Sequence, residues 1–529
     1  MSNLAKQTGI KIKMEETFFW GFFMLLTLAK ALGFYEGQKL FLLLVVPGLL
    51  CGLLKILASP YTKRQLFMVA ALLSMTALVY WRSHATGILF VAFLVLGMKG
   101  ISVKRAFHVG LWVWAVCAVV LSVFSFFRLE HTIYRVHAKL GLGHIFRWSL
   151  GFTHPNILHI TYLALCAFIL YEMGERYRLR HFILLMIGNL LVFLYSVSYT
   201  GFGIVMVLLT GFLYVQVRPR FCMLEKVLVN LVLPFSLFFS FILPKLLNNN
   251  PICGWMIHAL NALLNTRLWM ADQFLSPEYR SLFGIDISQV VKSSMTMDNS
   301  YVMGYINYGL IPFALIIIGY FALLFYLTHR QKTRELVILV CFLAAGWTEQ
   351  LLFNTSFKNI TLIFLGAMLF ERQDGEKEYC ILPCFQKERW IPFAGLPDLA
   401  AARVGAVWKA HKRSVLAMIL AGGIAGGVLC AVCYEVPAGY VVQRFYTDGL
   451  EETSVYLESA DDPAYAGYRV MNYKDAETPM QVITGKAVEL ETFRYYLGSI
   501  LIGGTAGALL GVPGIGYRER KRGTIGETP

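Results

Sequence analysis

Long apolar runs separated by short clusters of lysine and arginine are the feature that most limits what this chain can fold into. Most of the runs are about 20 residues long, the length that an α-helix needs to cross the hydrocarbon core of a bilayer. Of the 529 residues, 57% are apolar and only 15% are charged. Soluble domains cannot bury so much apolar surface. The sequence therefore predicts that lipid surrounds most of the chain.

Fourteen segments of this kind are predicted to be transmembrane helices. They are residues 18–35, 38–58, 65–81, 85–98, 106–127, 155–173, 181–198, 200–217, 223–243, 305–328, 335–351, 356–370, 414–434 and 495–513. The expected fold class is an all-α polytopic membrane protein. About twelve helices would form one bundle within residues 1–370, and two more would follow at the C-terminal end.

The distribution of basic residues predicts which helix ends face the cytoplasm. If the N-terminus with Lys6, Lys11 and Lys13 is cytoplasmic, 30 of the 47 Lys and Arg residues fall in cytoplasmic segments and 16 fall outside. Lys30 is the one cation assigned to neither side, and every short loop follows the positive-inside rule. We expect both termini in the cytoplasm. The net charge of +15 then reflects membrane topology, and no nucleic-acid partner is expected.

The chain lacks the motifs of several enzyme and transporter classes. It contains no Walker-type nucleotide-binding loop, no zinc motif and no paired Asp-x-Asp. An ATP-driven pump and a metal-dependent nucleotide-sugar transferase are therefore disfavoured. We expect neither a metal ion nor a cofactor.

Three segments predicted to lie outside the membrane are long enough to build a site, and they differ in charge. Residues 128–154 are cationic, residues 244–304 are balanced, and residues 435–493 carry eleven acidic and four basic residues. The cations of the first segment are Arg128, Arg135, Lys139 and Arg147. An anionic lipid headgroup would be attracted to the first segment and repelled by the third.

Several polar residues at span ends are candidates for a site. An arginine can hold two phosphate oxygens at once, and Arg147 precedes His154-Pro155-Asn156, where a helix re-enters the membrane. The alternative is that Arg147 and the neighbouring histidines only anchor the chain at the interface. Asp298 has an alternative role as a helix cap. Glu349 adds a polar group from a further span, and such convergence indicates a functional site.

These residues resemble motifs of the O-antigen ligase and O-antigen polymerase (Wzy-type) superfamily, over roughly residues 18–370. The motifs are Arg147…Gly151-Phe152-Thr153-His154-Pro155-Asn156, Ser196-Val197-Ser198-Tyr199-Thr200-Gly201, Asn265…Arg267…Trp269 and Asp298-Asn299-Ser300-Tyr301…Gly309-Leu310. Their order and the large loop between spans nine and ten support the resemblance. It implies a GT-C-like glycosyltransferase of the bacterial plasma membrane. Its substrate would be an undecaprenyl-diphosphate-linked oligosaccharide, used without metal or nucleotide sugar.

The resemblance also implies roles for individual residues. Arg147 and Arg267 match the two arginines that hold the diphosphate. Independently of the resemblance, an acceptor hydroxyl needs a base nearby, and Asp298, His154 and Glu349 are the candidates. Further residues expected to contact the substrate are Arg128, Arg135, Asn156, Asn299 and Tyr301.

Two departures from the ligase pattern favour a polymerase that joins one lipid-linked repeat to another. Asp298 stands where the ligase branch has a histidine, and Ser198-Tyr199-Thr200 stands where Ser-Arg-Thr is frequent. An O-antigen-ligase-type transfer of the glycan to a cell-envelope acceptor is the near alternative. A flippase for lipid-linked oligosaccharides is a further alternative, although it should place more cations inside its spans. A purely structural membrane scaffold does not explain the arginines and histidines gathered on one outer face.

The C-terminal part is predicted to be an addition to the bundle. Residues 371–413 would be a basic cytoplasmic linker, and residues 414–529 a two-span module around the acidic segment 435–493. The glycine-rich spans allow close helix packing in lipid. The layout weakly resembles a polysaccharide co-polymerase (Wzz-type), which implies a chain-length regulator or self-association through these spans. The alternative is an appendage with no regulatory role.

Overall fold

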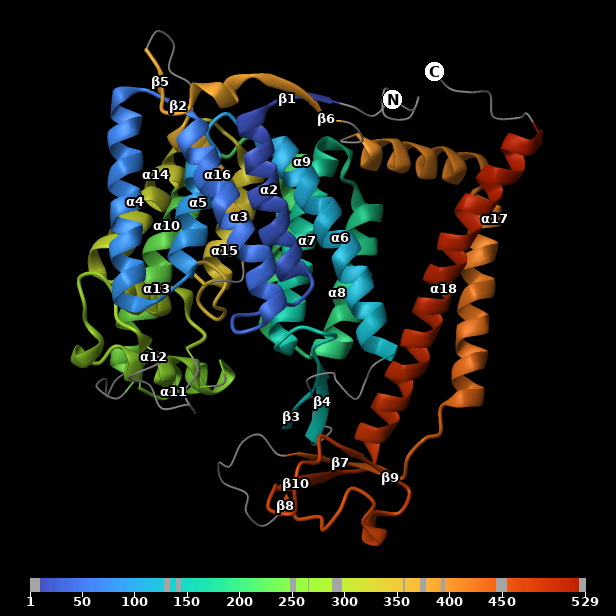
Figure 1. Cartoon of the computed structure of the whole chain (residues 1–529). Coiled ribbons are helices and arrows are strands. Elements are labelled where there is room, and N and C mark those ends of the chain that lie inside the picture. The colour runs from blue at the N-terminus through green and yellow to red at the C-terminus, as the bar shows by residue number, and fades with distance from the viewer. Residues whose placement is uncertain are drawn as a thin grey trace.

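The computed structural model describes residues 10–127, 134–138, 144–247, 254–264, 266–287, 297–354, 357–371, 377–391, 395–443 and 454–522. Helices dominate, and most of them run alternately up and down in one bundle (Figure 1). A pair of long helices stands beside this bundle, and a small sheet lies below the pair. Arg128 and Asn265 lie outside the described residues.

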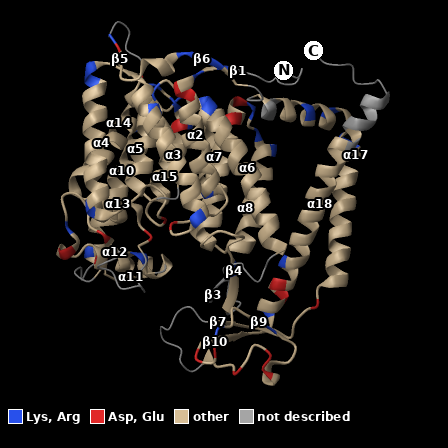
Figure 2. Cartoon of the chain, viewed as in Figure 1, with Lys and Arg blue, Asp and Glu red and all other residues tan. Residues whose placement is uncertain are grey.

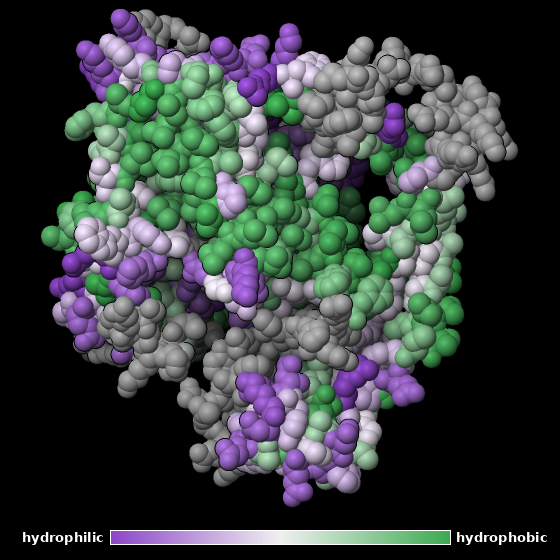
Figure 3. All heavy atoms as spheres, viewed as in Figure 1, coloured by the Kyte–Doolittle hydropathy of each residue, from purple (hydrophilic) through white to green (hydrophobic). Residues whose placement is uncertain are grey.

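Ten helical segments among the described residues are long and apolar enough to cross a membrane. The helices concerned are α3 (Lys39–Ala58), α4 (Lys63–Ser83), α6 (Val103–Phe127), α7 (Pro155–Met173), α8 (Leu179–Ser196), α9 (Tyr199–Val217), α10 (Met223–Leu237, continued by the π-helical η3, Phe238–Ile242), α14 (Leu310–His329), α17 (Leu396–Cys433) and α18 (Lys486–Arg522). On the face shown in Figure 3, apolar side chains cover the middle of the bundle and hydrophilic ones lie towards its ends. The protein is therefore membrane-embedded.

Four of the fourteen predicted spans correspond to helices that are too short or too charged to be counted among these ten. The helix α2 (Met14–Ala31) has 18 residues but carries charges near both ends. The other three, α5 (Gly87–Gly97), α15 (Thr333–Ala345) and α16 (Thr361–Leu369), have 11, 13 and 9 residues. At about 1.5 Å per residue they rise only about 14 to 20 Å. The expectation that all twelve helices of the bundle are long and apolar enough to span the membrane is therefore not met by these four.

The chain between α15 and α16 is irregular but satisfies its backbone groups through side chains. The Ser300 hydroxyl donates to the carbonyl of Glu349 and accepts from the N–H groups of Leu351 and Leu352. The Asn359 amide donates to the carbonyl of Leu352, at 2.9 Å. Irregular backbone inside a membrane protein is tolerated when it is buried and hydrogen-bonded in this way. These contacts fix the turn that carries Glu349.

Segments predicted to be cytoplasmic meet at one end of the bundle. Strand β1 (Ile10–Lys13) pairs with β6 (Glu388–Ile391), and β2 (Pro60–Tyr61) pairs with β5 (Tyr379–Cys380), both antiparallel. The charged residues gather at this end and at the opposite one (Figure 2). Residues 371–413 are therefore more than a linker, because their described part forms two strands and the start of a helix.

That helix, α17, is predicted as a span at 414–434 but begins at Leu396 and bends at His411, where φ is −130°. Its first part runs sideways from the upper edge of the bundle towards α18, and its second part runs alongside α18 (Figure 1). Three basic residues, Lys409, Lys412 and Arg413, flank the bend. Such charge is compatible with a helical segment that lies at the membrane surface ahead of a span.

The two C-terminal helices pack through glycines. A Cβ atom on Gly503 would lie 2.2 Å from the carbonyl oxygen of Gly422, and one on Gly426 would lie 2.2 Å from that of Ser499. Such approach of two backbones is the small-residue packing that the sequence predicts for these spans.

The all-α prediction is wrong for residues 435–493, where a four-stranded mixed sheet forms with the order β8-β10-β7-β9. Its strands are β7 (Gly439–Gln443), β8 (Ser454–Val455), β9 (Tyr468–Met471) and β10 (Met480–Ile483). Side chains alternate between the two faces of a strand. Val441 accordingly packs with Leu457 and Met480 on one face, while Tyr440 and Val442 join a cluster on the other.

The elements that build the candidate site lie towards the end of the bundle opposite β1 (Figure 1). They include the antiparallel hairpin of β3 (Tyr134–Ala138) and β4 (His144–Trp148), and the short helices α11 (Gly254–Leu263), α12 (Arg267–Phe274) and α13 (Ser300–Tyr308). Gly309 separates α13 from α14 with φ of +82°, and a Cβ there would lie 2.4 Å from the nitrogen of Phe283. Only glycine fits this break.

Candidate active site

Arg267 is held by two carboxylates at the first position of α12. Its Nε donates to Asp298 Oδ2 at 3.3 Å, and its Nη2 donates to Glu349 Oε1 at 3.2 Å. Next to it, Leu268 is buried against η3 and neighbouring segments, which anchors the start of the helix. The three charged residues come from α12, from the chain before α13 and from the turn after α15. The long loop and the interrupted span therefore meet at one guanidinium.

Glu349 is the centre of the cluster. Its Oε1 also accepts from Asn156 Nδ2 at 3.0 Å and from Thr200 Oγ1 at 3.2 Å. The side chain is only 10% exposed. Helices α7 and α9 thus contribute to the same oxygen atom that Arg267 contacts, so four separate parts of the fold converge here. We call Arg147, Asn156, Arg267, Asp298 and Glu349 the arginine–carboxylate cluster.

Arg147 reaches this cluster from β4. Its Nη2 donates to Asn156 Oδ1 at 2.5 Å, and its Nε donates to the carbonyl oxygen of Ser196 at 2.9 Å. The residue is only 6% exposed. An interfacial anchor extends its charged head into water, so burial argues against that alternative. The Asn156 amide now links both arginines, because its oxygen accepts from Arg147 while its nitrogen donates to Glu349.

The pKa of Glu349 is raised above its usual value. Burial is the main cause, and Arg267 opposes the shift while Asp298 adds to it. Glu349 lies in the turn after α15, which ends at Ala345. Its carboxyl group takes up a proton more readily than that of an exposed glutamate.

The helix cap considered for Asp298 is provided by its neighbour. Asn299 Oδ1 accepts from the N–H groups of Tyr301 and Val302, and Asn299 Nδ2 donates to Ser240 Oγ. The Asp298 side chain is thereby left to bond Arg267, and it is 37% exposed. A substrate at the surface of the cluster can reach it.

Three other predicted site residues, Tyr301, His154 and Asn299, make hydrogen bonds within the chain. Tyr301 is fully buried, and its hydroxyl donates to the carbonyl of Leu343 at 2.8 Å. His154 caps α7, where its Nδ1 accepts from the N–H of Asn156 at 3.1 Å. Asn299 caps α13, as described above. Arg135 faces Arg147 in the register of the hairpin, and nothing is described of its side chain.

Two partners in the cluster, the Thr200 hydroxyl and the Ser196 carbonyl, were not predicted as site residues. Both lie in Ser196-Val197-Ser198-Tyr199-Thr200-Gly201, one of the motifs that carry the resemblance. Val197 adopts a left-handed conformation at φ of +45°, which ends α8 and turns the chain into α9. A backbone carbonyl as the acceptor for Arg147 carries no signal in the sequence.

The arrangement can bind and stabilise an anion. Two guanidinium groups contact a single Asn156–Glu349 pair, the buried one of Arg147 from β4 and the partly buried one of Arg267 from α12. Guanidinium groups fixed in this way bind phosphate oxygens through paired hydrogen bonds. The partly exposed Asp298 carboxylate beside Arg267 can accept a proton. Comparisons of the chain with protein-family models, curated proteins and solved structures found no match.

Proposed function

We propose that the protein is a membrane glycosyltransferase. It polymerises undecaprenyl-diphosphate-linked oligosaccharide repeat units into a surface or capsular polysaccharide. The observation that carries this proposal is the contact of Arg147 and Arg267 with the same Asn156–Glu349 pair. Two arginines so placed, at one end of a membrane-embedded bundle, suit a diphosphate whose lipid tail remains in the bilayer. The resemblance to Wzy-type polymerases assigns both arginines to this role.

In the proposed reaction, a hydroxyl of one repeat attacks the anomeric carbon of another. A new carbon–oxygen bond forms while the bond from that carbon to the diphosphate breaks, and the diphosphate leaves with the electron pair. Negative charge grows on the leaving group, so Arg147 and Arg267 stabilise the transition state more than the bound substrate. The hydroxyl proton passes to a carboxylate of the protein.

We assign the base role to Asp298. Its side chain is the more exposed of the two carboxylates and it contacts Arg267, which would hold the donor. Glu349 is more deeply buried and accepts three hydrogen bonds on one oxygen, which suits an orienting role. His154 caps a helix next to the cluster.

The positive-inside pattern predicts that the cluster lies on the outer face of the bacterial plasma membrane and that both termini lie in the cytoplasm. The segments assigned to the same side lie together in the fold. At the β1 end, Lys99 pairs with Glu378 at 2.9 Å and Arg105 pairs with Glu16 at 2.9 Å. Polymerisation would then use repeats that have already crossed the membrane.

Replacement of either arginine tests the proposal. Arg147→Ala and Arg267→Ala should each abolish polymer in cells, while the protein stays inserted and lipid-linked single repeats accumulate. Loss of one such contact costs about 10²–10³ in rate. Lysine should rescue poorly, because a point charge lacks the bidentate fork. Arg280→Ala, an exposed arginine of the same loop, is the matched control. Polymer at wild-type levels in both alanine variants would remove the diphosphate assignment.

A further inference from the structure

An aromatic cluster joins the C-terminal module to the strand that carries Arg147. The ring of Trp148 lies 5.2 Å from that of Tyr495 on α18 and 5.4 Å from that of Tyr195 at the end of α8. The ring of Phe146 lies 5.0 Å from that of Tyr440 in the sheet. Phe146 and Trp148 are 1% and 0% exposed. The module therefore packs directly on β4.

Polar contacts accompany this packing. Trp148 Nε1 donates to Glu491 Oε2 at 2.8 Å, and Arg494 Nη1 donates to the carbonyl of Phe146 at 2.8 Å. Glu491 and Arg494 also form an ion pair, with side chains 2% and 0% exposed. Buried charges are costly unless they are paired and hydrogen-bonded. A displacement of α18 along β4 would separate them from these partners, so the pair fixes the position of the helix on the strand.

These contacts reach both segments that hold Arg147. Side chains alternate along a strand, so Phe146 and Trp148 face α18 while Arg147, between them, faces Asn156. At the end of α8, the hydroxyl of Tyr195 donates to the carbonyl of Arg494 on α18 at 2.8 Å. The next residue, Ser196, supplies the carbonyl that accepts from Arg147. The helix α18 thus contacts the strand that carries the guanidinium and the segment that receives it.

We infer that Glu491 and Arg494 are positioning residues for Arg147, through which the C-terminal module controls binding of the diphosphate. This inference rests on the proposed function for the role of Arg147. It assigns to the module a direct action on the site, where the sequence alone predicted an addition outside the catalytic bundle. Movement of α18 away from β4 would release Arg147 and lower the affinity for the substrate.

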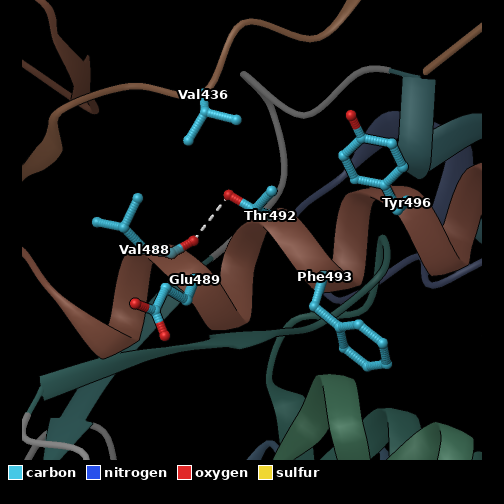
Figure 4. Close-up of a pocket in the computed structure, with 6 residues that line it drawn as sticks. All are labelled: Val436, Val488, Glu489, Thr492, Phe493 and Tyr496. Atoms are coloured by element: carbon cyan, nitrogen blue, oxygen red, sulfur yellow. Dashed lines mark hydrogen bonds between the residues drawn. The ribbon is translucent and has the colours of Figure 1, made fainter. Parts of the chain in front are cut away.

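The same helix supplies a matched control. At about 100° per residue, Glu489, Phe493 and Tyr496 lie on the face of α18 away from Glu491 and Arg494. They line a pocket of about 390 Å³ together with Val436, Val488 and Thr492 (Figure 4). The side chain of Glu489 is exposed. Glu489→Gln therefore makes the same chemical change as Glu491→Gln on the same helix, without touching β4.

The test uses the purified full-length protein and undecaprenyl diphosphate as the probe. Glu491→Gln and Trp148→Phe should each weaken binding about tenfold, and Glu489→Gln should bind as the wild type does. Trp148→Phe keeps an aromatic ring in the cluster but removes the donor to Glu491 together with the rest of the indole, so it tests the contact from the β4 side. In an Arg147→Ala background, Glu491→Gln should cause no further loss. A further tenfold loss on adding Glu491→Gln to Arg147→Ala would overturn the inference. Wild-type binding by both Glu491→Gln and Trp148→Phe would also overturn it.

Hydrogen exchange separates this inference from the proposed function. Backbone exchange across residues 144–150 should rise in Glu491→Gln and Trp148→Phe and stay unchanged in Glu489→Gln. Exchange in α3, which lies elsewhere in the bundle, should stay unchanged in all three. A wild-type protein that does not bind undecaprenyl diphosphate would overturn the proposed function, and the exchange data would still decide whether α18 holds β4. Unchanged exchange in β4 would overturn the positioning role.

Discussion

Glu349 and Asp298 contact the same guanidinium but differ in exposure, which predicts different effects of removing their charge. Asp298→Asn removes the proposed base and should lower the polymerisation rate by about 10²–10⁴. Glu349→Gln keeps the shape but weakens the bond to Arg267, and hydrogen bonds to charged groups contribute about 1.5–3 kcal/mol. We expect a loss of about 10- to 100-fold. Both losses are measured as the rate of polymer formation in membranes, at a saturating and at a low substrate concentration. A larger loss in Glu349→Gln than in Asp298→Asn would exchange the two roles.

The raised pKa of Glu349 predicts a dependence on pH. As the pH falls through this raised pKa, the carboxyl group gains a proton and loses the charge that orients Arg267. Activity should therefore decline on the acidic side, with an apparent pKa above the value of about 4.3 that is usual for glutamate. A pH–rate profile of polymerisation measures it. In Glu349→Gln this acidic limb should move to lower pH, and an unmoved limb would assign it to another group.

At the scale of single residues, the sequence singled out charged residues that the fold brings together, but it did not indicate their contacts. Motif order singled out Arg147, Arg267 and Asp298, and burial and charge then gave them partners that are distant in the chain. The adjacent residue Asn299 shows the limit. Both residues can cap a helix, and only the backbone geometry before α13 decides that Asn299 does so.

Among the elements, the glycine-lined pair of α17 and α18 gives a prediction about stability. A Cβ on Gly503 would lie 2.2 Å from a carbonyl oxygen of α17, whereas one on Gly423 would meet ordinary contact distances of 3.4 Å. Gly503→Ala should therefore lower the midpoint of thermal unfolding in detergent. Gly423→Ala should leave it unchanged or raise it, because alanine favours a helix by up to about 1 kcal/mol over glycine. Equal midpoints for the two variants would contradict this packing.

Element positions followed from the sequence better than element lengths did. A run of apolar residues places a segment in lipid, but it does not show where the helix stops inside the bundle. The helix α15 ends at Ala345 because the following turn is satisfied by side chains from other elements, such as Ser300 and Asn359. Such partners are distant in the chain. The same applies to the sheet in residues 435–493, whose short strands pair across the acidic segment.

For the whole molecule, the sequence predicted a bundle with an added module but not the contact between them. Trp148 and Glu491 are separated by 343 positions, and neither stands in a recognisable motif. The strand β4 is short and its alternation covers only five residues. Only the assembled fold shows that Arg147 lies between two residues that pack on α18.

Reconstituted polymerisation tests the central claim most directly. The purified full-length protein would be placed in liposomes with lipid-linked repeats, which are isolated from cells that lack the protein. The assay would contain EDTA and no nucleotide sugar. If guanidinium groups stabilise the leaving diphosphate in place of a divalent cation, as proposed, a ladder of products should form. Undecaprenyl diphosphate should be released with each bond formed, and Arg267→Ala should give neither. Absence of a ladder from the wild type, or a ladder only after Mg²⁺ or Mn²⁺ is restored, would contradict the proposed mechanism.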